Sequence, residues 1–258
     1  MSNPVLQTKS LSKAFGGLTA VDQVDLSVEA GKITSIIGPN GAGKTTMFNL
    51  IAGVYLPTSG EIHFQGKPLG KAPPYERAAL GIARTFQNVL LFDNMTALEN
   101  VMTGQHPRSR YGFFEAALRL PKAHREEETI LLNARKYLNL VGLGMYADRN
   151  PLSLPLGQQK LLTIARALAT EPKLLLLDEP GAGLNALEKQ SLSELIRRIR
   201  EMGITVVLVE HDMDLVMGIA EWVIVLDSGQ KIAEGTASQI QKNKRVIAAY
   251  LGDEEAVE

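Results

Sequence analysis

Residues 38–46, which read Gly-Pro-Asn-Gly-Ala-Gly-Lys-Thr-Thr, have the residue types of a phosphate cradle. The glycines let the backbone turn so that successive N–H groups and the start of a following helix point at an anion. Lys44 adds a mobile positive charge, and the hydroxyl of Thr45 is a ligand that Mg²⁺ accepts. An apolar run at 33–37 and a helix-compatible run at 47–51 flank the stretch, which is the setting this motif requires. The sequence therefore predicts nucleotide binding rather than a chance glycine-rich turn. The residues expected to contact the nucleotide here are Asn40, Gly41, Ala42, Gly43, Lys44, Thr45 and Thr46.

A helix is predicted between residues 185 and 203. Asn185 is typical of a helix N-cap, Glu188 follows three residues later as in a capping box, and Gly203 suits the end of the helix. Apolar runs at 174–177 and 204–209 flank the helix, which indicates a strand, a crossover helix and a second, parallel strand. The apolar face expected to pack on these strands consists of Leu187, Leu192, Leu195, Ile196 and Ile199.

Polar pairs end both predicted strands: Asp178 and Glu179 follow the first, and Glu210 and His211 follow the second. Because the carboxyl ends of parallel strands meet at one edge of a sheet, we expect these side chains beside the phosphate cradle. There Asp178 can hold Mg²⁺, Glu179 can polarise the water that attacks the γ-phosphate, and His211 can hydrogen-bond that phosphate. A charged helix start beside Pro180 and a structural histidine are the alternatives, and the shared position beside the cradle favours catalysis.

Bulk composition narrows the class of protein. With 258 residues and a formal net charge of −1, the chain can bury a large core and is not a protein whose main partner is nucleic acid. It has no cysteine, which excludes disulfides and thiolate metal sites, and its four histidines lack metal-ligand spacing. No secretory signal and no apolar run of about 18 residues is present, so we expect a protein that does not enter a membrane by itself.

Several separated motifs make the chain resemble the ATP-binding subunits of ABC transporters over nearly its whole length. Phe15, twenty-three positions before Gly38, stands where that family places an aromatic side chain that stacks on adenine. Gln87 resembles the glutamine whose loop couples Mg²⁺ and the attacking water to the membrane subunits. The resemblance implies ATP and Mg²⁺ as cofactors, with Glu179, His211 and Gln87 as catalytic residues and Thr45, Gln87 and Asp178 as metal ligands.

Residues 154–158, Leu-Pro-Leu-Gly-Gln, replace the family's usual Leu-Ser-Gly-Gly-Gln signature, which opens a helix facing ATP held by a second subunit. Pro155 removes a hydroxyl and an N–H group but is tolerated in the first turn of a helix. The N–H groups of Leu156, Gly157 and Gln158 can still meet an anion at the helix start. Asn185 stands where the family usually has an aspartate, and its capping role suffices to explain it. The altered Pro155-Leu156 segment makes an unlike partner ATPase an attractive hypothesis.

The resemblance also implies the fold. We expect an α/β protein with a P-loop, RecA-like ABC ATPase core, an N-terminal antiparallel β subdomain and a helical subdomain. One ABC domain should span residues 1–258, with 1–87 and 166–258 forming the β subdomain and the core, and 88–165 forming the helical subdomain. Residues from about 97 to 169 should be mostly helical.

Within the family, the chain looks most like the larger ATPase subunit of branched-chain amino acid importers. The variant signature, the segment 104–121 and the ending 248–252 carry this likeness, and related urea or lipopolysaccharide transporters share much of it. The implied protein lies on the cytoplasmic face of the inner membrane and powers import of branched-chain or other amino acids. Its implied partners are transmembrane permease subunits, a second identical or homologous ATPase subunit and, indirectly, an external substrate-binding protein.

Three other classes of protein are less consistent with the residues. A P-loop small-molecule kinase gives no reason for the Gly157-Gln158 helix or for His211. A GTP switch would need an Asn-Lys-x-Asp motif, whereas residues 243–246 read Asn-Lys-Arg-Val. A non-transport ABC ATPase, which acts on nucleic acid or as an assembly scaffold, is often tandem or carries long insertions, and neither feature occurs in this sequence.

Overall fold

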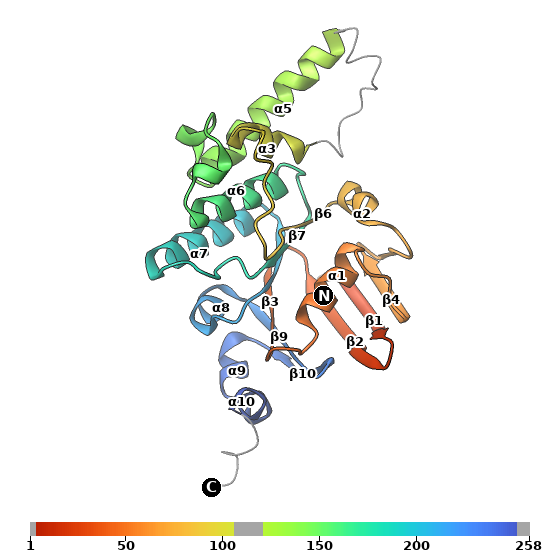
Figure 1. Cartoon of the computed structure of the whole chain (residues 1–258). Coiled ribbons are helices and arrows are strands. Elements are labelled where there is room, and N and C mark those ends of the chain that lie inside the picture. The colour runs from red at the N-terminus through yellow and green to blue at the C-terminus, as the bar shows by residue number, and fades with distance from the viewer. Residues whose placement is uncertain (1–3, 106–120, 252–258) are drawn as a thin grey trace.

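The computed structural model describes residues 4–105 and 121–251 of the chain, and Figure 1 shows its two β-sheets with the helices around them. A four-stranded sheet has the order β2-β1-β4-β5, and a six-stranded sheet has the order β10-β9-β3-β8-β7-β6. The strands of the first sheet are β1 (Pro4–Phe15), β2 (Leu18–Glu29), β4 (Ser59–Phe64) and β5 (Lys67–Pro68). Those of the second are β3 (Ile33–Ile37), β6 (Ile82–Arg84), β7 (Leu174–Asp178), β8 (Thr205–Val209), β9 (Trp222–Asp227) and β10 (Gln230–Gly235).

The helices surround the six-stranded sheet, and α1 lies between it and the four-stranded sheet (Figure 1). The N-terminal half of the chain contributes α1 (Lys44–Ala52), α2 (Pro74–Leu80) and α3 (Ala97–Thr103). The remaining helices are α5 (Pro121–Leu140), α6 (Leu156–Leu168), α7 (Ala186–Glu201), α8 (Met213–Ile219), α9 (Ala237–Gln241) and α10 (Lys244–Leu251). Within the ranges given above, no helix is both long enough and apolar enough to cross a bilayer.

The six-stranded sheet is parallel except at one edge. Strands β6, β7, β8, β3 and β9 pair in parallel, and β10 adds to β9 in the antiparallel sense. Every residue of β3, β7 and β8 is buried, as expected of strands covered on both faces. Alternation along β7 explains this, because Leu175 and Leu177 join a core with α6 and α7, whereas Leu174 and Leu176 join a core with α1. The predicted strand, helix and parallel strand are confirmed.

The pairing register of β3, β8 and β7 brings together the strand ends that carry the candidate catalytic and phosphate-binding residues. Ile36 of β3 pairs with Val209 of β8, and Asp178 of β7 pairs with the same Val209. The loop after β3 is the phosphate cradle, so it emerges beside Asp178 and beside the residues that follow β8. The sheet therefore brings three distant parts of the chain to one edge.

The middle of the chain contains three packed helices. α3, α5 and α6 contact one another, and their buried apolar side chains share a core with α7. The expected helical content of residues 97–169 thus holds for α3, α5 and α6, although short 3₁₀ turns and loops join α5 to α6. Most of the segment 104–121, one of three features behind the likeness to branched-chain amino acid importers, lies outside the described residues.

α7 confirms its predicted cap and corrects one position of its predicted face. Asn185 Oδ1 accepts from the Glu188 N–H at 3.0 Å, and Glu188 Oε2 accepts from the Asn185 N–H at 2.9 Å, which is a capping box. Leu187, however, is 73% exposed and takes no part in the apolar face. Leu187 lies five positions before Leu192, so in a helix of 3.6 residues per turn it points about 140° away from Leu192 and the buried stripe.

Candidate nucleotide-binding site

The phosphate loop is fixed by close backbone packing. Gly38 and Gly43 have φ angles of 151° and 97°, and Gly41 has φ 83°. A Cβ atom on Gly38 would lie 2.0 Å from the carbonyl oxygen of Leu226, and one on Gly43 would lie 2.4 Å from that of Ala20. Only glycine fits these two positions. α1 begins directly after the loop with no side-chain cap, so its first N–H groups remain available to an anion.

Lys44 lies inside the curl of this loop. Its side chain is buried, and its ammonium donates to the carbonyl oxygens of Gly38 at 2.7 Å and Pro39 at 2.9 Å. Burial lowers the pKa of Lys44, and the nearby carboxylates of Glu179 and Asp178 act in the opposite direction. The loop therefore combines oriented backbone dipoles with one partly desolvated cation, which suits a phosphate group.

An aromatic platform lies at the end of β1. Phe15 is 41% exposed, and its ring meets that of Tyr55 edge-on, with centroids 5.2 Å apart. The ammonium of Lys13 lies 4.9 Å from the Phe15 centroid and donates to the carbonyl oxygen of Leu56. An exposed ring held in this way can stack on a flat base. Phe15 was expected here from the sequence, whereas Tyr55 and Lys13 belong to no motif that would have indicated them.

Asp178 is buried at the end of β7 and has a partner that the sequence did not reveal. Its Oδ2 accepts from Arg84 Nη2 at 2.7 Å, and Arg84 Nη1 donates to Asn49 Oδ1 of α1 at 2.5 Å. The Arg84 guanidinium also lies over the rings of Phe48 at 5.7 Å and Phe86 at 5.0 Å. The aspartate therefore has a fixed orientation.

Gln87, Glu179 and His211 meet at one carboxylate oxygen. Gln87 Nε2 donates to Glu179 Oε2 at 2.8 Å, and His211 Nδ1 lies 3.9 Å from the same oxygen. The His211 side chain is 61% exposed, so it is not a buried structural histidine. The structure thus brings together all three residues expected to be catalytic, next to Asp178 and on the same sheet edge as the phosphate loop.

The expected signature segment has different surroundings. α6 begins at Leu156, which is half exposed, and Pro155 is the residue before the helix rather than part of its first turn. A Cβ atom on Gly157 would lie 2.8 Å from Glu188 Oε1, at the start of α7. The oxygen Oε1 of Gln158 is a buried acceptor with no partner within the part of the chain that the structure describes. Within one chain, this helix start packs on α7 and not on the phosphate loop.

The donor set beside the loop suits Mg²⁺ that is shared with a nucleotide. Thr45, Gln87 and Asp178 offer a hydroxyl, an amide and a carboxylate oxygen, which are the hard ligands that this cation prefers. Gln87 uses its amide nitrogen for Glu179, which leaves its carbonyl oxygen for a cation. Over residues 4–105 and 121–251, no group of three or more His, Cys, Asp or Glu side chains could form a metal cage. Phosphate oxygens would therefore complete the coordination.

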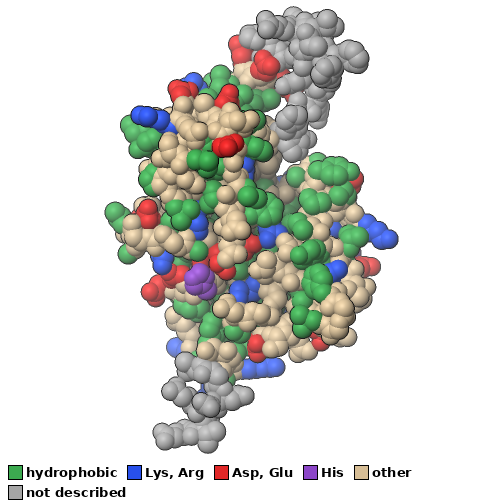
Figure 2. All heavy atoms as spheres, in the orientation of Figure 1, with side chains coloured by type: hydrophobic (Ala, Val, Ile, Leu, Met, Phe, Trp, Pro, Cys, Tyr) green, Lys and Arg blue, Asp and Glu red, His purple; other side chains and the backbone are tan. Residues whose placement is uncertain are grey.

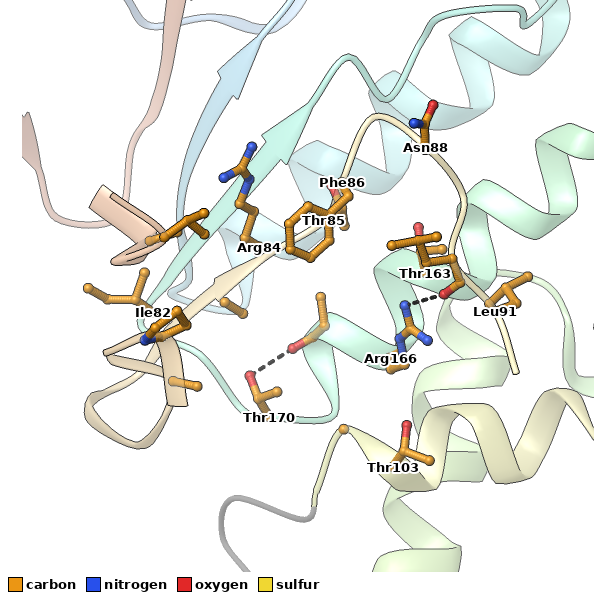
Figure 3. Close-up of a pocket in the computed structure, with 18 of the residues that line it drawn as sticks. Ile82, Arg84, Thr85, Phe86, Asn88, Leu91, Thr103, Thr163, Arg166 and Thr170 are labelled. Carbon is orange, nitrogen blue, oxygen red and sulfur yellow. Dashed lines mark hydrogen bonds between the residues drawn. The ribbon is translucent and has the colours of Figure 1, made fainter. Parts of the chain in front are cut away.

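A cavity of about 740 Å³ lies beside the site, between α2, β6, α3 and α6 (Figure 3). Phe86, directly before Gln87, lines it together with Leu90 and Arg166. Arg166 Nη2 donates to the carbonyl oxygen of Leu90 at 2.7 Å, and the buried Asn100 bonds both the N–H and the carbonyl oxygen of Phe92. The segment after Gln87 is thus anchored by α3 and α6. Figure 2 shows hydrophobic side chains gathered over α2 on this side of the molecule.

A phosphate loop after a buried parallel strand, with carboxylates at the ends of neighbouring strands, defines a P-loop nucleotide hydrolase. The ABC transporter family matches residues 21–182, and the family of branched-chain amino acid ATP-binding cassette transporters matches residues 230–256. The chain belongs to the ABC transporter family as an ATP-binding subunit.

Individual relatives cover the chain almost completely. The high-affinity branched-chain amino acid transport ATP-binding protein BraF of Pseudomonas aeruginosa is 44% identical over 254 residues, which are 98% of this chain and 100% of BraF. An ATP-binding cassette of an ABC transporter in its ADP conformation superposes with a TM-score of 0.85 at 33% identity, over 98% of this chain and 100% of that one. A dimeric cassette bound to ADP and Pi superposes with a TM-score of 0.77 at 29% identity, over 90% and 98%. The predicted α/β ABC ATPase fold is confirmed.

Proposed function

We propose that this chain hydrolyses ATP to power a membrane ABC transporter that imports branched-chain amino acids, or other amino acids of similar kind. The observation that carries the proposal is the meeting of Gln87 and His211 at one oxygen of Glu179, beside Asp178. Full-length similarity to BraF and the C-terminal match at residues 230–256 support the class of substrate.

The phosphate loop binds the nucleotide in this proposal. N–H groups of residues 40–46 surround the phosphates, and the Lys44 ammonium exchanges its carbonyl partners for phosphate oxygens. Phe15 stacks on adenine at the other end. Thr45, Asp178 and Gln87 are the residues that would hold Mg²⁺, which would supply positive charge to offset that of the phosphates.

Glu179 is the general base. Its carboxylate accepts a proton from the attacking water while Gln87, which donates to Oε2, fixes the direction of that carboxylate. His211 is exposed at the mouth of the site and donates to the γ-phosphate. The water oxygen bonds the γ-phosphorus as the bond from that phosphorus to the β–γ bridging oxygen breaks, so ADP leaves and inorganic phosphate forms while Glu179 holds the water proton. No covalent enzyme intermediate is needed.

A second ATPase subunit completes each site. The start of α6 packs away from the chain's own phosphate loop, and its uncapped N–H groups at Leu156, Gly157 and Gln158 suit an anion supplied from outside. A head-to-tail pair brings that helix start onto ATP held by the partner. A similar cassette is a dimer with ADP and Pi, which supports pairing of this kind.

Permease subunits dock in the cavity beside Gln87. Phe86, Leu90 and Phe92 give the cavity an apolar lining, and all three side chains are exposed. An apolar segment of a membrane subunit fits such a groove. Because Phe86 directly precedes Gln87, movement of a docked segment reaches the glutamine that touches Glu179.

This assembly places the chain peripherally on the cytoplasmic face of the inner membrane. An external binding protein delivers the substrate, and nucleic acid has no part in the proposal. A urea or lipopolysaccharide transporter, or a non-transport ABC ATPase, is the alternative function. The similarity to BraF over 98% of the chain favours the amino acid importer.

Glu179→Gln tests the proposal. The variant should bind ATP, remain paired and lose turnover by at least about 100-fold, because an amide cannot take the proton from water. Tagged Glu179→Gln can be purified with ATP from detergent-solubilised native membranes. Polytopic membrane subunits and a periplasmic-type binding protein should co-purify with it.

Lys44→Ala is the control, and it should lose nucleotide binding itself and recover no complex that depends on ATP. Normal turnover by Glu179→Gln would contradict the catalytic assignment. Recovery of only soluble or nucleic-acid partners would instead support a non-transport ATPase.

A further inference from the structure

The backbone just after the β7 strand is held by a buried lysine from α6. Lys160 is 9% exposed, and its ammonium donates to the carbonyl oxygens of Glu179 at 3.1 Å, Pro180 at 3.4 Å and Ala182 at 2.5 Å. Burial lowers the pKa of Lys160, and the carboxylates of Glu210 and Glu179 oppose this. A single ammonium thus donates to three carbonyl oxygens of one turn, which its three N–H groups allow.

A buried carboxylate holds the same turn by accepting from one of its N–H groups, whereas Lys160 donates to its carbonyl oxygens. Glu210 is fully buried after β8, and its Oε1 accepts from the Gly181 N–H at 2.6 Å. Its Oε2 accepts from the His211 N–H at 3.2 Å. A Cβ atom on Gly181 would lie 2.8 Å from that Oε1, so the glycine lets the carboxylate approach. Charge-assisted bonds of this kind are about twice as strong as neutral ones.

Glu179 needs such support because its backbone is strained. It has a φ of 44° although it is not glycine, and a proline follows it. Such conformations are unfavourable for residues other than glycine and persist only where the surroundings hold them. The Glu179 N–H donates to the carbonyl oxygen of Val209 at 2.9 Å, and its own carbonyl accepts from Lys160. The backbone bonds therefore determine where the carboxylate points.

We propose that Lys160 and Glu210 are positioning residues, which clamp residues 179–182 so that the Glu179 carboxylate faces the attacking water. The inference rests on the proposed role of Glu179 as the base. Lys160 also ties that base to α6, whose start at Leu156 lies one helical turn away and is proposed to face the ATP of the second subunit. Contact between the start of α6 and the ATP of the second subunit thereby sets the geometry of Glu179, which is the base for the ATP bound by this chain.

Lys160→Met removes the ammonium and keeps the length of the side chain. In single-turnover hydrolysis of saturating Mg-ATP by the full chain, the rate should fall about 10- to 100-fold, because small displacements of a reacting group suffice for such losses. The Kd for ATP should stay within about twofold, since no phosphate contact is removed. Lys160→Arg, which keeps a cation with several donors, should recover most of the rate.

Arg77→Met is the matched control. Arg77 is 1% exposed and donates to the carbonyl oxygens of Leu50, Ile51 and Ala72, far along the chain from the catalytic turn. It should lower the Tm and leave the rate per folded molecule unchanged. A Lys160→Met variant that lost Tm and ATP affinity together, at an unchanged rate, would overturn the inference by showing an ordinary structural role.

The Glu179→Gln background separates this inference from the proposed function. If Lys160 acts through Glu179, adding Lys160→Met to Glu179→Gln should slow the residual hydrolysis by less than about twofold. An equal fold-loss in both backgrounds would overturn the inference. Should Lys160→Met fail to fold, Glu210→Gln decides: a rate at least about threefold lower at unchanged ATP affinity supports the clamp, and a wild-type rate overturns it. Normal turnover by Glu179→Gln would instead contradict the proposed function.

Discussion

At the scale of single residues, Arg84 joins the candidate magnesium aspartate to the helix of the phosphate loop. Its guanidinium bonds both Asp178 and Asn49 and lies over the rings of two aromatic side chains. The side chains of Arg84 and Asp178 are 7% and 3% exposed, so water screens this ion pair poorly. Removing one partner would leave the other charge buried and unpaired.

Arg84→Met should therefore lower the free energy of unfolding by about 3–5 kcal/mol. The double variant Arg84→Met/Asp178→Asn should lose clearly less than the sum of the two single losses, because the second change removes the stranded charge. Denaturant unfolding of the full chain measures all four proteins of this cycle. Additive losses would show that the two side chains do not depend on each other.

Residues such as Arg84, whose partners are distant in the sequence, could not be predicted from the sequence alone. The phosphate loop is a local pattern, and the positions of Asp178, Glu179 and His211 followed from the ends of apolar strands. Arg84 lies 94 positions from Asp178, and Lys160 reaches its carbonyl partners across 19 to 22 positions. No spacing rule connects such pairs, because only the packed sheet and helices bring them together.

At the scale of elements, local signals predicted the ends of α7 better than its buried face. The capping box at Asn185 and Glu188 formed as expected because its partners are three residues apart. The assignment of Leu187 to the buried face was wrong because its position around α7 turns it away from the stripe that contains Leu192 and the other buried residues. α6 has no side-chain cap at all, and its start follows directly after Pro155.

Asn185→Ala should lower the free energy of unfolding by about 1 kcal/mol, which is the usual effect of removing an N-cap side chain. Asn185→Asp keeps an acceptor for the Glu188 N–H and should match the wild type in both stability and ATP turnover. Chemical denaturation and steady-state ATPase assays distinguish the two variants. A severalfold change of turnover in Asn185→Asp would reveal a role at the subunit interface beyond capping.

At the scale of the whole molecule, the sheet separates two surfaces with different tasks. The carboxyl ends of β3, β7 and β8 carry the nucleotide site, and the edge strand β6 leads into the apolar cavity. On the face drawn in Figure 2, acidic and basic side chains lie together near the centre, between the two lobes of Figure 1. The proposed docking surface and the proposed site of hydrolysis are therefore adjacent but chemically distinct.

Leu90→Glu should break the proposed docking without affecting nucleotide binding. The Leu90 side chain is 61% exposed and lines the cavity, so a carboxylate there leaves the fold intact but opposes an apolar partner. In the Glu179→Gln background, co-purification of membrane subunits should fall at least about tenfold. Leu132→Glu, on α5 at 68% exposure and outside the cavity lining, is the matched control and should retain them. Equal recovery with both variants would place the docking surface elsewhere.

The cavity beside Gln87 also has a pharmacological consequence. An ATP site must accept a triphosphate, so a compound aimed at it competes with the nucleotide itself. The cavity is lined largely by apolar side chains and has a volume of about 740 Å³, within the usual range for drug-sized ligands. A small molecule bound there would block the proposed docking of the permease without occupying the nucleotide site itself.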